Sequence, residues 1–266
     1  MVPSKPGLHA ISSRDNPLVK RLRRLAEHPG AYRRLGQFWI EGEHLCRAAM
    51  SCGVMPATVV VAQGALGLVP LALTDAGTEC SVLQDRLFAE ISGLGSSPGF
   101  GFLVDLPAAA VPRSGQASLV LDRIQDAGNV GSILRSAAAF GFRQVLAIRG
   151  TAGLWSPKVL RAAMGAHFSL ALIEALTCED VLALGMPLVV TSSHHGESLR
   201  SAAIPPSCAW VFGHEGQGVA SALQDQAAMS VRIDQPGGEE SLNVAAAAAI
   251  CLHASSVVWQ GKVADS

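Results

Sequence analysis

Charged residues are scarce in this chain of 266 residues: they make up 15% of it, and aromatic residues make up only 5%. Hydrophobic residues reach 49%, so the chain can bury a sizeable core, and its composition argues against intrinsic disorder. The shortage of aromatic side chains favours aliphatic α/β packing over an aromatic-rich β-sandwich. A chain of this length forms one large domain or two modest ones.

Long apolar runs and paired cysteines are also missing. No uninterrupted run reaches 18 apolar residues, and the basic N-terminus lacks an apolar segment, so we expect neither a membrane span nor a secretory signal. The pair His194–His195 has no third ligand at zinc spacing, and we expect an exposed loop pair and no metal site. The cysteines form no CxxC pair, which indicates reduced thiols in a cytoplasmic protein. They are Cys46, Cys52, Cys80, Cys178, Cys208 and Cys251.

The net charge of −1 hides an asymmetry along the chain. Residues 1–50 carry nine Lys and Arg against four Asp and Glu, whereas the remainder carries eleven against seventeen. A solvated helix face explains such a cluster, but clustered guanidinium groups also attract a nucleic-acid backbone. The candidate nucleic-acid-binding residues are Arg14, Lys20, Arg21, Arg23, Arg24, Arg33 and Arg34.

Two α/β blocks follow each other along the sequence. In the first, hydrophobic patterns predict helices at Leu18–Leu25, Gly42–Ser51 and Gln84–Ile91, and strands at Thr58–Ala62 and Gly101–Leu106. Pro107–Gly115 lacks periodicity and reads as an interdomain linker. We therefore expect domains at 1–106 and 117–266, joined by a linker at 107–116.

The second block alternates short apolar strands with helices. This pattern predicts a mostly parallel sheet covered on both faces, with ligands beyond the carboxyl ends of the strands. The expected strands are Ser118–Leu121, Gln144–Ile148, Leu188–Thr191, Ala209–Phe212 and Met229–Ile233. The expected helices are Val130–Phe140, Pro157–Met164, Glu179–Leu184, Ala220–Gln226 and the alanine-rich Leu242–Trp259.

Three loops of this block carry candidate site residues. In Asp122–Gly141, Asn129 has the position of a helix N-cap, and Arg135 follows on the helix, either exposed or in a functional role. The loop Gly213–Gly218 reads GHEGQG, which is neither a P-loop nor the Rossmann fingerprint; it forms either a tight turn or a ligand loop around Glu215. In the third loop, Ser241 has the position of an N-cap, and the helix N-terminus after it could bind an anionic group.

The order and spacing of these loops resemble the three motifs of the SpoU (TrmH-like) family of RNA 2′-O-ribose methyltransferases, in the trefoil-knotted SPOUT superfamily. The matching segments read NVGSILRSAAAFG (Asn129–Gly141), FGHEGQG (Phe212–Gly218) and SLNVAAAAAI (Ser241–Ile250). The segment Ser156–Phe168 is similar to the one between the family's first two motifs. Ile11–Leu25 and Phe38–Leu45 resemble the family's substrate-recognition domain, which has a ribosomal-protein-L30e-like fold.

The resemblance implies an α/β protein with a C-terminal knotted SPOUT methyltransferase domain and a smaller N-terminal L30e-like α/β domain. It also implies S-adenosylmethionine as the cofactor, held mainly by backbone groups, and a homodimer in which Arg135 lies near the interface. The residues implied at the cofactor are Gly213, Ile233 and Leu242, with Thr191, Phe212, Gly216 and Val244 as neighbours.

The family's reaction explains the residue types. A sulfonium methyl is an activated electrophile that needs no metal, but the weakly acidic ribose hydroxyl must be oriented and its developing charge stabilised. Because a guanidinium essentially never deprotonates, we expect Arg135 to hold the adjacent phosphate rather than to act as a base. Asn129, Glu215, Ser241 and Asn243 are then expected to orient Arg135, the ribose and the loops.

Three positions depart from the family pattern without removing a residue that has a proposed chemical role. Asp234 follows Ile233 where proline is usual, and it could face the adenosine or solvent. Ala245 stands where serine is frequent, and His214 stands where a small or amide residue is frequent.

The sequence thus predicts a cytoplasmic RNA ribose 2′-O-methyltransferase. The separate N-terminal domain favours ribosomal RNA, of the large (23S) type, over transfer RNA. A catalytically inactive knotted RNA-binding or ribosome-assembly factor is the first alternative, which intact Asn129, Arg135, Glu215 and Asn243 disfavour. The second is a nucleotide-binding metabolic enzyme on an ordinary doubly wound sheet. It requires a phosphate-binding glycine loop after the first strand of a βαβ unit, and the sequence contains none.

Overall fold

The computed structural model describes residues 8–70, 73, 78–94, 97, 99–192, 195–237 and 241–264, with side chains to residue 257. His194 lies outside the described residues. The chain divides into two compact units, of which the first comprises Met1–Ala108 and Trp155–Phe168. The second comprises Ala109–Leu154 and Ser169–Ser266. The segment from Trp155 to Phe168, expected in the second domain, thus packs with the first unit.

The first unit contains a five-stranded mixed sheet. Its order is β1 (Leu8–Ile11), β4 (Cys80–Leu83), β3 (Thr58–Ala62), β5 (Phe100–Asp105) and β2 (Gln37–Glu41). Strand β5 runs antiparallel to both β3 and β2, and the β1–β4 and β3–β4 pairs are parallel. The apolar run at β3 was predicted correctly, but β1, β2 and β4 were not predicted.

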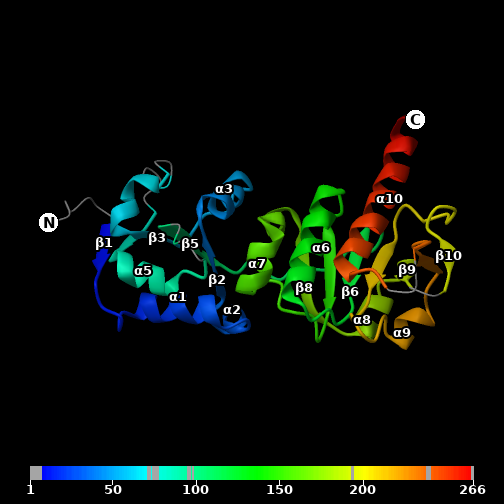
Figure 1. The fold of residues 1–266 in the computed structure, drawn as a ribbon, viewed down its shortest axis with the longest axis horizontal. Coiled ribbons are helices and arrows are strands. Elements are labelled where there is room, and N and C mark those ends of the chain that lie inside the picture. The colour runs from blue at the N-terminus through cyan, green and yellow to red at the C-terminus, as the bar shows by residue number, and fades with distance from the viewer. Residues whose placement is uncertain are drawn as a thin grey trace. The chain divides into compact units, whose positions relative to one another are not determined.

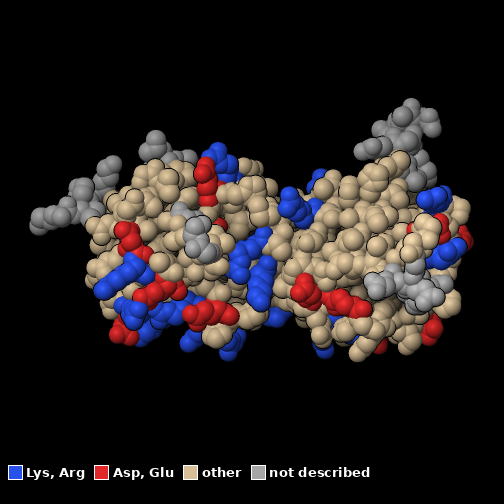
Figure 2. Space-filling model, viewed as in Figure 1, with Lys and Arg blue, Asp and Glu red and all other residues tan. Residues whose placement is uncertain are grey.

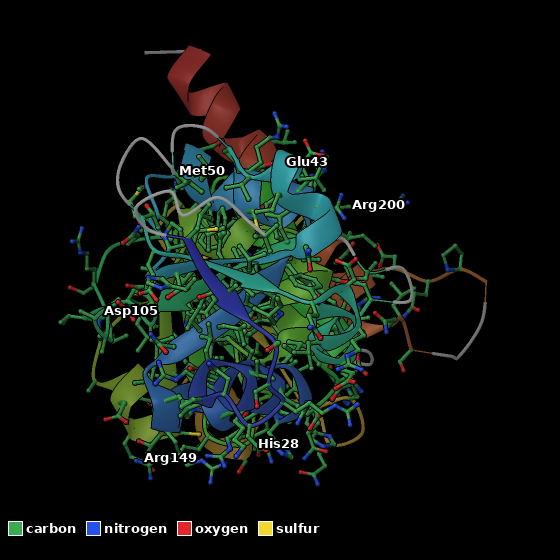
Figure 3. The ribbon with its side chains drawn as sticks, turned by 90° about the vertical axis from the view of Figure 1, so that its left-hand side faces the viewer. His28, Glu43, Met50, Asp105, Arg149 and Arg200 are labelled. Carbon is green, nitrogen blue, oxygen red and sulfur yellow. The ribbon has the colours of Figure 1, made fainter. Side chains whose placement is uncertain are left out.

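Helices cover both faces of this sheet. They are α1 (Pro17–Glu27), α2 (Ala31–Leu35), α3 (Glu43–Ser51), α5 (Asp85–Ile91) and α7 (Pro157–Ala163). Helix α1 begins where the Asn16 side chain accepts from the N–H of Leu18, and it buries Val19, Leu22 and Leu25 on one face. Helices α1 and α5 lie on the side of the sheet opposite α3, whose Glu43 and Met50 are labelled in Figure 3.

The second unit contains a seven-stranded sheet in which every neighbouring pair is parallel. This confirms the predicted parallel sheet. Its order is β10 (Glu197–Ser198), β12 (Met229–Arg232), β9 (Leu188–Thr191), β11 (Ala209–Phe212), β6 (Ser118–Leu121), β7 (Gln144–Ile148) and β8 (Ala171–Leu176). Strands β8 and β10 were not predicted. Because β11 lies between β9 and β6, the chain returns to the centre of the sheet after leaving its edge.

The two faces of this sheet pack against different helices. Helices α6 (Ala127–Ala139) and α10 (Val244–Ala264) cover one face, and α8 (Cys178–Leu182) and α9 (Ser221–Gln224) cover the other (Figure 1). Side chains alternate between the faces of a strand. On β11, Val211 accordingly packs in one cluster with Val181 and Leu223, whereas Trp210 points to α10. No helix in the described part of the chain is both long and apolar enough to cross a membrane.

The segment expected to be a linker is partly fixed. The buried Gln144 side chain accepts from the N–H of Arg113 at 2.8 Å and donates to its carbonyl at 3.1 Å. No helix or strand forms at 106–117, as the lack of periodicity predicted. The end of this segment is therefore held against β7 by two hydrogen bonds.

One buried hydrogen bond joins α10 to the sheet and can be tested. The indole Nε1 of Trp210 donates to the Ser255 hydroxyl at 2.8 Å, and both residues are buried. Ser255→Ala leaves the indole N–H without an acceptor, so we expect the free energy of unfolding to fall by about 1–3 kcal/mol in urea titrations of the full chain. Ser256→Ala is the control, because the Ser256 hydroxyl donates to the carbonyl of the exposed His253. An equal loss in both variants would contradict the assignment.

Candidate functional site

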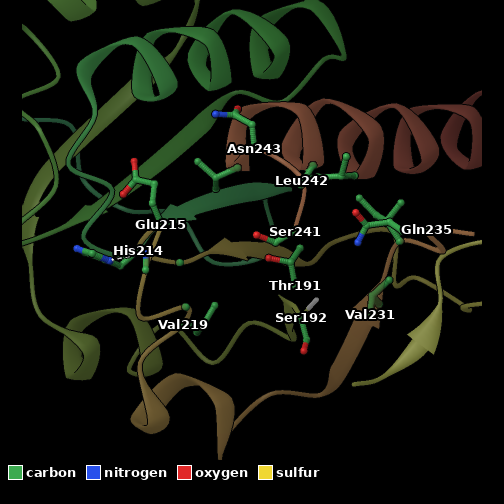
Figure 4. Close-up of a pocket in the computed structure, with 16 residues that line it drawn as sticks. Thr191, Ser192, His214, Glu215, Val219, Val231, Gln235, Ser241, Leu242 and Asn243 are labelled. Carbon is green, nitrogen blue, oxygen red and sulfur yellow. Dashed lines mark hydrogen bonds between the residues drawn. The ribbon is translucent and has the colours of Figure 1, made fainter. Parts of the chain in front are cut away.

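A cavity of about 490 Å³ opens at the carboxyl ends of the parallel strands of the second unit. Thr191 ends β9, Gly213 follows β11 and Ile233 follows β12, so three strands bring their following loops to this cavity (Figure 4). The start of α10 closes another side. The described lining residues are Thr191, Ser192, Gly213, His214, Glu215, Gly216, Gly218, Val219, Val231, Ile233, Gln235, Ser241, Leu242, Asn243, Val244 and Ala247.

The first motif begins helix α6 at the carboxyl end of β6. The carboxylate of Asp126 caps this helix by accepting from the N–H of Asn129 at 2.7 Å. The interpretation of Asn129 as the N-cap is therefore wrong, because the helix starts two residues earlier. Since Asp126 satisfies the helix N–H group, the Asn129 side chain is free to bond outside its own helix.

The third motif begins helix α10, and Asn243 caps it. Its Oδ1 accepts from the N–H groups of Ala245 at 2.9 Å and Ala246 at 3.4 Å. The prediction of Ser241 as the N-cap is wrong, because the helix starts at Val244 and Ser241 stays in the loop that lines the cavity. The nearby asparagine supplies the cap with the same chemistry.

A chain of hydrogen bonds joins the three motifs. The Nδ2 of Asn243 donates to Oδ1 of Asn129 at 3.0 Å, and the Nδ2 of Asn129 donates to Oε1 of Glu215 at 3.1 Å. Glu215 also accepts from the N–H groups of Asp126 at 3.2 Å and Gln125 at 3.3 Å. Side chains 86 and 114 residues apart in sequence are thereby fixed beside one cavity.

The Glu215 carboxylate is stabilised in its ionised form. Burial by itself raises the pKa of Glu215, but hydrogen bonds from its own N–H, from Asn129 and from the N–H groups of Gln125 and Asp126 lower it below the ordinary value. A lowered pKa means that this carboxylate stabilises the fold fully above the ordinary glutamate pKa, and that the contribution is lost as pH falls through the lowered value. Glu215 is thus charged at neutral pH.

A second set of contacts holds the far end of the glycine loop, and sequence reasoning missed it. The buried Asp122 carboxylate accepts from Nε of Arg123 at 2.8 Å and from the N–H of Ala220 at 2.6 Å. Nη1 of Arg123 donates to Oε1 of Gln217 at 2.9 Å, with the Arg123 backbone at φ +60°. An acidic residue directly after a buried strand was the signal available for Asp122.

The structure brings most of the predicted cofactor residues together. Thr191, Gly213, Gly216, Ile233, Leu242 and Val244 all line the cavity, as do the predicted Glu215, Ser241 and Asn243. Phe212 is fully buried and is absent from the described lining. Arg135 is exposed on α6, about 9 Å along the helix axis from Asn129, and it also does not line the cavity of this chain.

The predicted basic cluster lies on and beside α1 and α2. Blue side chains there alternate with red ones in Figure 2, and the ion pairs explain why: Arg14 and Arg23 contact Glu90, and Lys20 contacts Asp15 at 2.8 Å. Such solvent-accessible pairs contribute little stability. Arg21 donates to Gln37 at 3.1 Å, and the Arg33 guanidinium lies over the Tyr32 ring. Arg24 and Arg34 are exposed.

Asp234, which departs from the family pattern, bonds away from the cavity. Its carboxylate accepts from the Ser198 hydroxyl and pairs with Arg232 at 3.1 Å. These contacts hold β10 against the end of β12. Among the described residues, no group of three His, Cys, Asp or Glu side chains is arranged to hold a metal ion.

A ligand cavity at the carboxyl ends of a parallel sheet defines an α/β ligand-binding domain, and comparison with known proteins gives its family. Residues 116–253, more than half of the chain, match the model of the SpoU rRNA Methylase family. The chain belongs to this family. The match covers the three motif loops and the cavity they build.

Individual relatives agree with this assignment. The 23S rRNA (guanosine(2553)-2′-O)-methyltransferase RlmP of Bacillus subtilis (strain 168) is 29% identical over 91% of this chain and 97% of its own length. A solved structure described as an RNA 2′-O ribose methyltransferase is 29% identical, with a TM-score of 0.76 over 92% of this chain and 97% of its own. An AdoMet-bound rRNA methyltransferase from Sinorhizobium meliloti has a TM-score of 0.82 over 95% of this chain and 98% of its own, at 24% identity. That last likeness concerns the fold.

Proposed function

We propose that this protein transfers a methyl group from S-adenosylmethionine to a ribose 2′-hydroxyl of ribosomal RNA of the 23S type. The observation that carries the proposal is the hydrogen-bond chain Asn243–Asn129–Glu215, which joins the three family motifs beside one cavity. Membership of the SpoU family and the likeness to RlmP support the same reaction and RNA class.

The cavity residues fit the cofactor. A volume of about 490 Å³ lies within the usual range for small-molecule sites, and valine, leucine and isoleucine side chains share the described lining with hydroxyl and amide groups. The described lining residues include no Lys or Arg, and they include the ionised Glu215, which suits a positively charged ligand. When bound, the cofactor supplies a methyl group on a sulfonium, which is already an electrophile. We assign its binding to Gly213, Ile233 and Leu242, with Thr191, Phe212, Gly216 and Val244 as neighbours.

The remaining site residues act on the RNA. Arg135 binds the phosphate next to the target ribose and stabilises the negative charge that develops on the ribose 2′-oxygen. Asn129, Glu215, Ser241 and Asn243 hold the motif loops and the ribose in the orientation that the transfer requires. In this proposal the guanidinium takes no proton, because it stays charged at every relevant pH.

The proposal includes a role for each domain. Residues 1–106 form an L30e-like domain that binds RNA through Arg14, Lys20, Arg21, Arg23, Arg24, Arg33 and Arg34. Residues 107–116 link it to a methyltransferase domain, residues 117–266, that is knotted at its C-terminal end. The position of β11 between β9 and β6 is compatible with such threading.

We further propose a cytoplasmic homodimer. Helix α10 carries the exposed apolar side chains Ile250 and Val257, and it packs beside α6, the helix of Arg135. If a second chain packs on these helices, Arg135 of one chain can reach the cavity of the other, although it does not line the cavity of its own chain.

The test is transfer of labelled methyl from S-adenosylmethionine to 23S ribosomal RNA that lacks the modification, with transfer RNA in parallel. We expect incorporation into ribosomal RNA at one nucleotide, with the neighbouring bond resistant to alkaline cleavage. RNA binding without incorporation would instead favour a non-catalytic assembly factor. Absence of cofactor binding would overturn the proposal.

A further inference from the structure

The glycine loop of the second motif, Gly213–Gly218, is a tight backbone turn, and the imidazole of His214 forms hydrogen bonds with its backbone. The N–H of His214 donates to the Gly218 carbonyl at 3.1 Å, and the N–H of Gly218 donates back to the His214 carbonyl at 2.8 Å. Gly218 has φ +68°, a conformation that other residues rarely adopt. The turn therefore places residues 215–217 in a small arc beside the cavity.

The His214 ring stabilises this arc by accepting hydrogen bonds from its backbone. Its Nδ1 accepts from the N–H of Gly216 at 3.0 Å and from the N–H of Gln217 at 3.2 Å. Both donors belong to the backbone, so neither can reverse its direction. Nδ1 can accept only when it carries no proton, and the neutral ring then carries its proton on Nε2. When Nδ1 carries a proton it becomes a donor, and it then faces two other N–H donors, so both hydrogen bonds are lost.

Other contacts involve the Glu215 and Gln217 side chains and the end of the loop, rather than the N–H groups of Gly216 and Gln217. Glu215 bonds to the N–H groups of Gln125 and Asp126 at the start of α6. From the end of β6, Arg123 bonds to Gln217, and Asp122 bonds to the N–H of Ala220. Glu215, Asp126, Asp122 and Arg123 are the charged residues that take part in these contacts. Within the turn itself, the side-chain acceptor for the two N–H groups is the imidazole.

We propose that His214 is a positioning residue of the cofactor site: its neutral imidazole fixes the N–H groups of Gly216 and Gln217, and its protonation releases the loop. Figure 4 places His214 and Glu215 on the same side of the cavity, opposite Val231 and Gln235. Loss of the two hydrogen bonds to Nδ1 makes the part of the cavity lining formed by Gly213 and Gly216 more mobile. Cofactor binding is then strongest while the His214 imidazole is neutral and weakens when the ring takes up a proton. The inference rests on the proposed function only for the identity of the cofactor.

The test compares two substitutions in the full chain. His214→Asn keeps an acceptor, since the amide Oδ1 occupies nearly the same place as Nδ1 but does not titrate between pH 5 and 8. His214→Ala removes the acceptor altogether. S-adenosylmethionine affinity is measured by calorimetry from pH 5.5 to 8.5 in each protein. The Asn variant also controls for the titration of Glu215 and of the amino group of the cofactor.

We expect wild-type affinity to fall about tenfold between pH 8 and pH 5.5, as two backbone hydrogen bonds are lost. His214→Ala should bind about tenfold more weakly than wild type at pH 8. His214→Asn should restore the affinity lost in the alanine variant and remove the extra pH dependence. An Asn variant with the wild-type pH slope, or an Ala variant with wild-type affinity at pH 8, overturns the inference.

A second readout does not depend on the cofactor. Amide hydrogen exchange of residues 216–218 is compared between wild type and His214→Asn at the same pH. Each of these amides keeps its own and its preceding side chain in both proteins, so its intrinsic exchange rate is the same. We expect faster exchange in wild type below pH 6 and equal exchange at pH 8. Equal exchange at both pH values overturns the inference even if the cofactor binds. Should no protein bind the cofactor while this difference is present, the proposed function fails and the role of His214 in the loop stands.

Discussion

Arg135→Ala is expected to lower kcat for methyl transfer by about 10²–10³-fold, the loss usual for one donor to a developing oxyanion. The affinity for S-adenosylmethionine should change less than about twofold, because the exposed Arg135 is assigned to the RNA phosphate and not to the cofactor. Single-turnover assays with ribosomal RNA, together with calorimetry, separate the two quantities. A cofactor defect of the same size as the rate defect would contradict the role on the RNA.

Arg135→Lys distinguishes a bidentate contact from a simple positive charge. Lysine keeps the charge but lacks the planar fork, so we expect it to recover only part of the lost rate. Arg143→Ala is the matched control, because Arg143 is also exposed but directly precedes β7. It therefore lies at the amino end of a strand, whereas the cavity lies at the carboxyl ends of the strands. Near-normal turnover in Arg135→Lys would argue against the bidentate role.

Gly213→Ala should reduce cofactor affinity by about 10–100-fold, which corresponds to an overpacking cost of about 1–3 kcal/mol. A Cβ at residue 213 would lie 2.2 Å from the carbonyl carbon of Gly218 and 2.3 Å from the nitrogen of Val219. Both are backbone atoms at the end of the glycine loop and just after it, so they cannot move aside as a flexible side chain can. The loop must therefore open where it lines the cavity.

The matched control is Gly237→Ala, two residues beyond Gln235 in the loop that precedes the third motif. A Cβ at residue 237 would meet no described atom within 4 Å, and the residue is exposed. Calorimetry and thermal unfolding of both variants measure binding and stability. We expect both quantities to fall only in Gly213→Ala, and equal binding by both variants would remove the backbone collision as an explanation.

Apolar runs predicted much of the second unit correctly, and the errors have physical causes. The strands at Ser118–Leu121 and Ala209–Phe212 are short runs of buried residues, which a parallel sheet requires on both faces. The run at β8 mixes half-exposed and buried residues because β8 is an edge strand, and it was not predicted. Gln37–Glu41 was also not predicted as a strand, although it pairs with β5.

The site residues were predicted by the motif resemblance, but their hydrogen bonds were not. Asn129, Glu215 and Asn243 lie in separate motifs, and nothing local indicates that Asn243 donates to Asn129. Cap assignment failed for a related reason. Serine and asparagine cap helices about equally well, and the point where the loop backbone becomes helical selected Asn243 over Ser241.

The separation of the motifs also governs when the site can form during synthesis. Asn129 and Asn243 are 114 residues apart, so at about 5–20 residues per second the ribosome needs roughly 6–23 s to supply the second after the first. In addition, β6 can pair with its neighbour β11 only after β11 has been synthesised, because β11 comes later in the chain. Contacts of such long sequence separation form slowly. Cofactor binding therefore requires the last step of folding, and a nascent or truncated chain that has β6 to β9 alone should be unable to bind it.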